Sequence, residues 1–382
     1  MLKITFCIIA QLMVGIAVLT SCSKVEKLSG PVISFAIPSE GFKVEVGKSL
    51  PLNPNVLNGD LSTYTWEVNG QIVSSAKSYT FIPSKIGSYS LRLKVSNDAG
   101  SDLKTIQINV FSNLSPFITK VFDYKYGPGQ HASLIPSNWK GDDFIGQPWI
   151  GTKNFTALGG WGGYIIVGFD HHVKNVDGVD FAIFTQPGAG SEPAVVYVMN
   201  DANSNGIPDD GEWLEIKGSE YNHPETIHDY QVTYYKPVSN GNVTWEDNKG
   251  NSGELKPVTE SPSWWWSGYG NNTEVVFKGI KLPNAYKNIS NQADSENWAV
   301  RSGMFTYGYA ECYNNLDYNN SLKANILDIS NAVDKAGNKI NLSGINFVKV
   351  QSGVFQLAGW LNEISTEVSG AVDLSLIEYA AN

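Results

Sequence analysis

Short segments in which apolar and polar residues alternate recur along the chain, and turn-forming residues separate them. Such alternation puts every second side chain on one face, which is typical of a half-buried β-strand. Pairs such as Asn58-Gly59 and Asn69-Gly70 supply the turns. We therefore predict a small β-sandwich over residues 31–112, with strands at 32–36, 42–46, 64–68, 78–82, 88–96 and 103–110.

A larger unit is predicted over residues 113–382, after a boundary marked by Pro116. Helical periodicity is scarce there, and a weak helix is expected only at 326–335. Two packed antiparallel sheets, as in a jelly roll, fit the pattern best, so the predicted fold class is all-β. The strands expected in this unit are 163–169, 180–185, 194–199, 230–235, 274–277, 345–351 and 372–376.

The N-terminus has the pattern of a secretory leader. Lys3 precedes an apolar run over 4–19, and small residues then lead to Cys22. The run is shorter than the roughly 20 residues that a membrane-spanning helix needs. We expect residues 1–22 to be a lipoprotein signal peptide, Cys22 to carry the lipid, and 23–30 to be a tether to the outer membrane surface.

Composition narrows the function classes. The net charge of −10 argues against nucleic acid as a partner, because phosphate binding needs clustered Lys and Arg. Cys7 leaves with the leader and Cys22 is consumed by lipid, so only Cys312 remains and no internal disulfide is expected. The 37 glycines, 11 tryptophans and 18 tyrosines fit a β-rich chain with many turns.

Residues 201–212 match the twelve-residue calcium-loop pattern. Ca²⁺ takes six to eight oxygens, and glycine at position six, Gly206, permits the sharp reversal. The role expected for the ion is structural. The alternative is a hairpin turn rich in Asn, Gly and Asp that holds no metal. The predicted ligands are Asp201, Asn203, Asn205, Ile207 through its carbonyl, Asp209 and Glu212.

Signals for catalysis are weak, and we predict a protein without enzymatic activity. Asp170-His171-His172 follows a predicted strand, but adjacent strand residues point to opposite faces and do not chelate one ion together. The chain has no HExxH, C-x-x-C or G-x-S-x-G motif. A carboxylate pair for glycoside hydrolysis needs proximity in space, so a glycoside-active enzyme, with acids such as Glu367 or Asp373, stays an alternative.

Three consecutive tryptophans, Trp264 to Trp266, lie in a segment with loop composition. Three neighbours cannot all face one core, and an exposed ring in a loop marks a binding face. The alternative is that these rings, with others such as Phe305 and Tyr309, plug the ends of a sandwich. The predicted ligand-binding residues are Trp264, Trp265, Trp266, Tyr269, Asn271, Asn272, Trp161, Trp298 and Tyr307.

The N-terminal sandwich resembles a PKD-like, immunoglobulin-type domain. The resemblance rests on Trp66 followed by the Asn69-Gly70 turn, and on residues 87–97. It covers about eighty residues. It implies a spacer or docking module, and no site is evident in it.

The whole chain resembles a family of Gram-negative cell-surface lipoproteins that place a PKD-like module before a larger β-domain. Glu311 and Cys312 depart from the usual pattern. The matching segments are 158–164, 167–171, 191–193, 200–220, 229–235, 307–310, 347–350 and 364–370.

The resemblance implies a surface protein that binds a cobamide such as cobalamin and hands it to a TonB-dependent importer without catalysis. Aromatic stacking and Asn side chains would suit such a ligand. The alternatives are a glycan-binding lipoprotein of a saccharide uptake system, using the same rings, and a glycoside-active enzyme.

Overall fold

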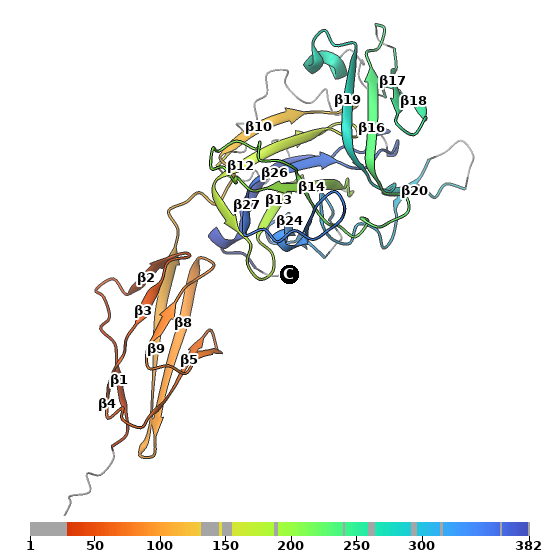
Figure 1. Cartoon of the computed structure of the whole chain (residues 1–382). Helices are drawn as coiled ribbons and strands as arrows, with labels where there is room; N and C mark the ends of the chain where they lie inside the picture. Colours follow the sequence, from red (N-terminus) through yellow and green to blue (C-terminus); the bar gives the residue numbers. More distant parts are fainter. Residues whose placement is uncertain are drawn as a thin grey trace, which may run out of the picture. The chain divides into compact units, whose positions relative to one another are not determined.

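The structure is a computed structural model that describes residues 29–130, 145–146, 155–186, 190–239, 241–258, 264–291, 296–313, 316–359 and 361–380. The described chain is built from β-strands and a few short 3₁₀ turns, without an α-helix, and the all-β prediction is confirmed (Figure 1). Within these ranges no helix is long and apolar enough to cross a membrane. The predicted leader and Cys22 lie outside them.

The chain divides into two compact units. One takes the residues before Ile37 together with Asn53–Tyr79 and Leu91–Ile106, and the other takes Ile37–Leu52, Thr80–Ser90 and Gln107 onward. The domain limits expected at residues 22, 30 and 112 stay predictions.

Residues 32–111 form one five-stranded sheet and two strand pairs. The sheet order is β2 (Phe42–Glu45), β9 (Gly100–Phe111), β8 (Gly87–Asn97), β5 (Thr63–Val68) and β6 (Gln71–Ser74). Strands β2 and β9 run parallel, and β5 is antiparallel to both β6 and β8. The pairs are β1 (Val32–Ser34) with β4 (Asn55–Leu57), and β3 (Leu50–Leu52) with β7 (Tyr79–Phe81).

Trp66 is the central core residue of this region, as its alternation predicts. It is 1% exposed, its indole N–H donates to the Ala76 carbonyl at 2.9 Å, and the Phe35 ring meets it edge-on. Asn69 and Gly70 both have positive φ, 48° and 85°, as a tight turn between β5 and β6 requires. The predicted hairpin is therefore present.

The described residues after β9 form the larger region of the chain. Two of its sheets pack face to face. The first is β10 (Lys120–Lys125), β12 (Tyr164–Lys174), β26 (Gly344–Ser352), β14 (Ala194–Met199), β15 (Leu214–Ile216) and β25 (Ala332–Val333), with β22 (Tyr309–Ala310) also on β14. The second is β11 (Thr156–Ala157), β27 (Glu367–Asp373), β13 (Phe181–Thr185), β24 (Ala324–Leu327) and β23 (Tyr318–Asn319). Their facing side chains, among them Val196, Val348, Phe181 and Ile183, form one apolar core.

Strand β14 is covered on both faces. Ala194, Val196 and Val198 point into the core between the two sheets, whereas Val195 and Tyr197 belong to a second cluster on the opposite face. This explains why the strand is an unbroken apolar run rather than an alternating one. The outer face of the first sheet therefore also packs against other segments of the chain.

A third, four-stranded sheet has its own aromatic core. Its order is β18 (Ser252–Leu255), β17 (Val243–Asp247), β16 (Ile227–Tyr235) and β19 (Glu274–Lys281), and β20 (Tyr286–Asn288) pairs separately with β21 (Trp298–Val300) (Figure 1). Tyr230, Tyr234 and Phe277 from this sheet pack with Trp161 and with Trp265. This cluster gathers rings from segments more than 100 residues apart in sequence, as Trp161 and Trp265 illustrate.

Two predicted elements are wrong. The helix expected at 326–335 is instead β24, a 3₁₀ turn η4 (Ile329–Asn331) and β25. Pairing with β13 and with β15 outweighs the weak helical period, and the Asp328 side chain accepts from Ser330 N to cap η4. The last predicted strand begins earlier and ends at Asp373, because Asp373 caps a second 3₁₀ turn, η5 (Leu374–Leu376).

A glycine segment around Trp161 lets two stretches of backbone approach closely. Gly127 N donates to Leu158 O at 2.8 Å, and Gly127 forms a bridge with Gly159. A Cβ on Gly163 would lie 1.8 Å from Leu158 O and 2.5 Å from Gly127 N. Only glycine fits there, and the segment fixes the position of Trp161.

Gly163→Ala is expected to lower the free energy of unfolding by about 2 kcal/mol or more, because the new methyl group overlaps backbone atoms that cannot move independently. Thermal and urea denaturation followed by circular dichroism measure the change. Gly30→Ala, whose added carbon would meet nothing closer than 3.8 Å, is the control. Equal stability of both variants would contradict the close-approach argument.

Candidate functional site

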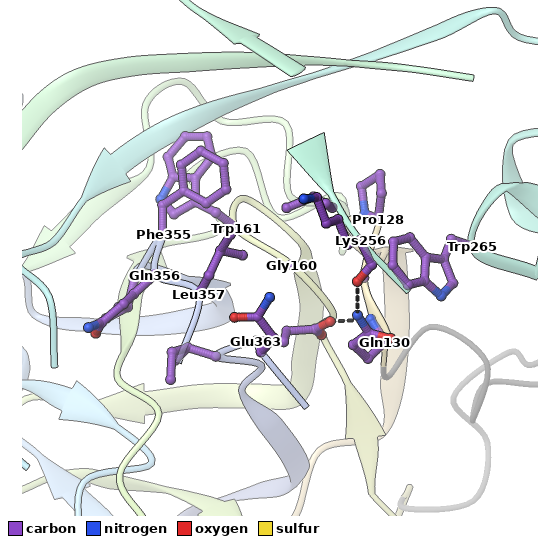
Figure 2. A pocket seen from close by; sticks show the side chains of 15 residues that line it. Pro128, Gln130, Gly160, Trp161, Lys256, Trp265, Phe355, Gln356, Leu357 and Glu363 are labelled. Carbon is purple, nitrogen blue, oxygen red and sulfur yellow. Dashed lines mark hydrogen bonds between the residues drawn. The ribbon is translucent and has the colours of Figure 1, made fainter. Parts of the chain in front are cut away.

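A small cavity in the described part of the larger region has room for about one water. It measures about 20 Å³ and is walled by Trp161, Trp265 and Phe355 (Figure 2). Gln130 closes one side: its backbone N–H donates to Glu363, and its side-chain amide donates to the Lys256 carbonyl at 2.8 Å. A cavity of this size is a packing feature rather than a ligand site.

The described rings of the tryptophan segment, Trp265, Trp266 and Tyr269, are buried rather than exposed, and their role in ligand binding stays a prediction. The segment forms the 3₁₀ helix η3 (Trp264–Tyr269), which turns back onto the four-stranded sheet. Trp265 is 0% and Trp266 3% exposed, and the Trp266 indole donates to Asn272 O at 2.7 Å. The Tyr269 hydroxyl donates to the Tyr126 carbonyl. The Trp264 side chain lies outside the described part of the structure.

The other predicted ligand residues are dispersed. Asn271 and Asn272 are exposed, Trp298 is half-buried with its indole donating to Glu296 at 3.1 Å, and Tyr307 is 41% exposed. Trp161 lines the small cavity. Of the eight predicted ligand residues whose side chains are described, none lines the large cavity described next.

The large cavity, of about 580 Å³, lies between the outer face of the first sheet and the four-stranded sheet. One row of cross-strand neighbours forms its floor. Lys349 on β26 is paired with Tyr197 on β14, Tyr197 with Glu215 on β15, and Glu215 with Val333 on β25. Neighbours opposite each other in antiparallel strands share a face, so these side chains line the cavity together.

Aromatic and polar side chains share the cavity lining. Two aromatics, Trp213 and Tyr221, are half-buried, and Tyr197 and Tyr230 are buried. Exposed residues at the rim, such as His228 and Asn248, show that the cavity opens to solvent. The remaining polar lining residues are Gln231, Glu212, Glu215, Asp229, Asp334, Lys278, Lys335 and Lys349.

Glu215 is the most buried ionisable group of the floor. It is 6% exposed, its Oε1 atom has no hydrogen-bond partner in the described structure, and its Oε2 lies 3.9 Å from His228 Nδ1. Burial raises the pKa of Glu215 to about 8, against a smaller lowering by Lys217. The carboxyl group is therefore largely protonated at neutral pH and can donate a hydrogen bond to a ligand.

Lys349 lies at the other end of the row. Its Nζ is 5.2 Å from the centre of the Tyr197 ring and 4.8 Å from that of Tyr164. Burial lowers the pKa of Lys349 to about 8, against the opposing charge of Asp123. The floor thus offers a cation and a carboxyl group on either side of one aromatic ring.

The predicted calcium loop is compact, and four of its side chains converge. Asp201 accepts from the backbone N–H of Asn205 at 3.0 Å and of Gly206 at 2.8 Å, and the Asn203 and Asn205 amides both donate to Asp209, at 3.3 and 3.1 Å. Position twelve differs from the prediction. Glu212 points to Lys335, with an Oε1 to Nζ distance of 2.6 Å.

Three carboxyl groups, of Glu192, Glu311 and Glu367, lie with ligand atoms within 4.8 Å of one another. Backbone donors hold them: Glu367 N donates to Glu311 at 2.6 Å, and Ser365 N donates to Glu192 at 2.9 Å. Burial raises the pKa of Glu311 well above its usual range, and the charges of Glu367 and Glu192 raise it further. These hydrogen bonds connect three chain segments, so the role of the three carboxyl groups is to hold the segments together.

The adjacent histidines bind different partners, as the strand geometry predicts. The His171 ring contacts Asp170 at 2.8 Å and Asp373 at 3.0 Å, whereas His172 contacts Asn346 at 3.1 Å. Asp373 and Glu367, the acids considered for glycoside hydrolysis, line neither cavity.

The comparison with protein families identifies the N-terminal module. A family model described as a PKD-like domain matches residues 30–97, which confirms the predicted PKD-like resemblance. The match covers less than half of the chain. No curated protein sequence matches the chain.

Several solved structures resemble the chain distantly. A quinonprotein alcohol dehydrogenase-like protein from Bacteroides thetaiotaomicron is 14% identical over 60% of this chain and 63% of its own, with a TM-score of 0.21. The SGBP-B protein of the mixed-linkage glucan utilization locus of Bacteroides ovatus, bound to a heptasaccharide, is 13% identical over 60% and 46%, with a TM-score of 0.21. Carbohydrate-binding modules of the β-sandwich superfamily are 16% identical over 66% and 91%, with a TM-score of 0.20. The chain therefore spans less than two thirds of the first two proteins.

Sequence reasoning missed the large cavity because its residues come from six strands and four connecting segments that only the sheet register brings together. One signal was available. Trp213 and Glu215 directly follow the calcium-type loop, and the alternation in Trp213-Leu214-Glu215-Ile216 puts both on the face opposite the buried Ile216.

Glu215→Gln is expected to remove a loss of stability at high pH. The folded-state pKa of Glu215 is raised, so its contribution to stability is complete below about pH 4 and is lost as the pH rises through 8. Between pH 5 and pH 9 the wild type should lose roughly 1–3 kcal/mol more than the variant. Urea unfolding at both pH values measures this, and parallel losses in the two proteins would contradict it.

Proposed function

We propose that the large cavity binds a saccharide and that the protein holds this ligand without transforming it. The observation that carries the proposal is the composition of the cavity: aromatic rings, side-chain amides and charged groups converge on one solvent-open space of about 580 Å³. Ligand sites typically measure about 300–1,000 Å³.

Sugars suit this lining because each pyranose ring has an apolar face and a rim of hydroxyl groups. Trp213 and Tyr221 offer flat apolar area, and Gln231 and Asn248 offer amides that both donate and accept. Tyr197 lies at the floor between two groups that can hydrogen-bond hydroxyls, Glu215 and Lys349.

The cobamide interpretation has less support. It relied on some of Trp264, Trp265, Trp266 and Tyr269 as stacking surfaces. The last three rings are buried in the aromatic core, and the Trp264 side chain lies outside the described part of the structure. A cobamide is also much larger than the ligands that cavities of this volume enclose. The glycan alternative therefore fits the geometry better.

The cellular setting belongs to the same proposal. The leader pattern ending at Cys22 supports a lipid anchor in the outer membrane, with the binding region at the cell surface. Delivery of the ligand to a TonB-dependent importer would be the corresponding task.

Titration calorimetry of a form lacking residues 1–22 against neutral and acidic oligosaccharides and cyanocobalamin tests the function. We expect saturable heat with at least one saccharide, and affinity about tenfold weaker in Trp213→Ala and in Tyr221→Ala because stacking is lost. Tyr307→Ala is the matched control, since Tyr307 is 41% exposed and lines neither cavity. Heat with cyanocobalamin alone would restore the cobamide interpretation, and release of reducing sugar would favour the enzyme.

We also propose that residues 201–212 bind a structural Ca²⁺. The convergence of Asp201, Asn203, Asn205 and Asp209 supports it, and these residues would hold the ion with hard oxygen ligands. Glu212 would complete the site on leaving Lys335. The ion would fix the loop that leads into Trp213, next to the large cavity.

Adding Ca²⁺ to the chelated protein is expected to raise the melting temperature, because binding to the folded state alone stabilises it. Asp201→Ala with Asp209→Ala should abolish the rise. Lys335→Met, which frees Glu212, should increase Ca²⁺ affinity measured by calorimetry. A melting temperature that is the same with chelator and with Ca²⁺ would exclude the metal.

A further inference from the structure

We propose, on the basis of the saccharide-binding function above, that the cavity selects saccharides that carry a carboxylate and that Lys349 receives this group. The row Lys349, Tyr197 and Glu215 would bind one acidic sugar unit. The sugar ring would lie in the cavity against this row, with its carboxylate on Lys349 and a hydroxyl on Glu215.

Lys349 is a cation that lacks a counter-charge in the cavity. It forms no salt bridge with a residue of the described ranges, and its Nζ lies 5.2 Å from the centre of the Tyr197 ring and 4.8 Å from that of Tyr164. Asp123 acts on it from β10, but the Asp123 carboxylate accepts the Tyr164 hydroxyl at 2.7 Å. Burying a cation without a partner is unfavourable, and a ligand carboxylate would remove that penalty.

Glu215 supplies the second, independent observation. Its side chain is more than nine-tenths buried, lines the cavity, and keeps one oxygen, Oε1, without a hydrogen-bond partner in the described structure. Buried polar atoms are normally paired, so this oxygen indicates a ligand contact. Two strand spacings, roughly 9–10 Å, separate its backbone from that of Lys349, which leaves room for one sugar ring to reach both groups.

The other charges of the cavity do not oppose an anion at this row. Glu212 is paired with Lys335 at 2.6 Å, and Asp334 accepts from Ala336 N at 2.9 Å and Asn338 N at 2.8 Å in its own turn. Asp229 and Lys278 are exposed at the rim, where solvent screens them. Protonated Glu215 carries no charge that would repel the carboxylate.

The test compares acidic oligosaccharides with their methyl esters, which keep the shape but lose the charge. A panel of oligogalacturonate, alginate and hyaluronan fragments, each in both forms, is titrated calorimetrically. We expect the acid to bind about tenfold more tightly than its ester, the gain typical of one hydrogen bond to a charged group. Lys349→Gln should remove this preference, and Lys349→Arg should retain it.

The pH dependence gives a second readout. Between pH 7 and pH 9 the affinity for the acid should fall, since Lys349 loses its charge while Glu215 gains one, and both changes disfavour an anion. The groups facing Lys349 are Asp123, Tyr164 and Tyr197. Those facing Glu215 are His228, Lys217, Tyr197, Tyr221 and Tyr309. Lys349→Arg and Glu215→Gln should each flatten the fall, and the ester should show little pH dependence.

The outcomes separate this inference from the proposed function. Equal affinity for acids and esters would overturn the role of Lys349 and leave saccharide binding intact. No heat with any saccharide would overturn both. Circular dichroism and melting curves of each variant establish that it is folded, so that lost selectivity in Lys349→Gln is read only from a folded protein.

Discussion

The structure depends on strand β14 being buried on both of its faces. Val196 and Val198 hold it against the second sheet of the sandwich, while Val195 and Tyr197 on the opposite side pack with other segments. A strand that serves two clusters at once cannot slip by one residue, because a slip would exchange its two faces. The register of β14 with β26 and β15 therefore fixes the sandwich core and the cavity floor together.

That register produces the electrostatics of the cavity. Lys349, Tyr197 and Glu215 each point away from the apolar core, and their neighbours in sequence, such as Val348 and Ile216, point into it. The third sheet then covers the row, which leaves it largely buried at the bottom of the solvent-open cavity. The same burial moves the pKa of Glu215 up and that of Lys349 down, both to about 8. A rigid two-layer core thus places a cation and a neutral carboxyl group at a fixed separation.

The tryptophan segment shows that a composition typical of loops is compatible with buried aromatic rings. Ser, Gly and Asn around Trp264–Trp266 are typical of loops, and the segment is indeed a short 3₁₀ turn. Its described rings are nevertheless part of the core, because the Tyr126 hydroxyl accepts from Gly268 N and the Tyr126 ring packs on Tyr269. Trp161 and Phe277 belong to the same cluster. Packing these rings into a large aromatic cluster is more favourable than exposing them to solvent.

Local pattern along the chain predicts several of the longer strands, the turn after β5 and the buried face of β5. Period-two alternation, continuous apolar runs and Asn-Gly pairs depend on neighbours in the chain, so Trp66, β14 and that turn were predictable, and so was the PKD-like resemblance of the N-terminal module. Which strands became neighbours depends on long-range pairing. The cavity row joins residues 134 positions apart, Lys349 and Glu215, through hydrogen-bonded pairing that local pattern does not encode. The helix expected at 326–335 failed for the same reason, since long-range strand pairing outweighed a weak local preference.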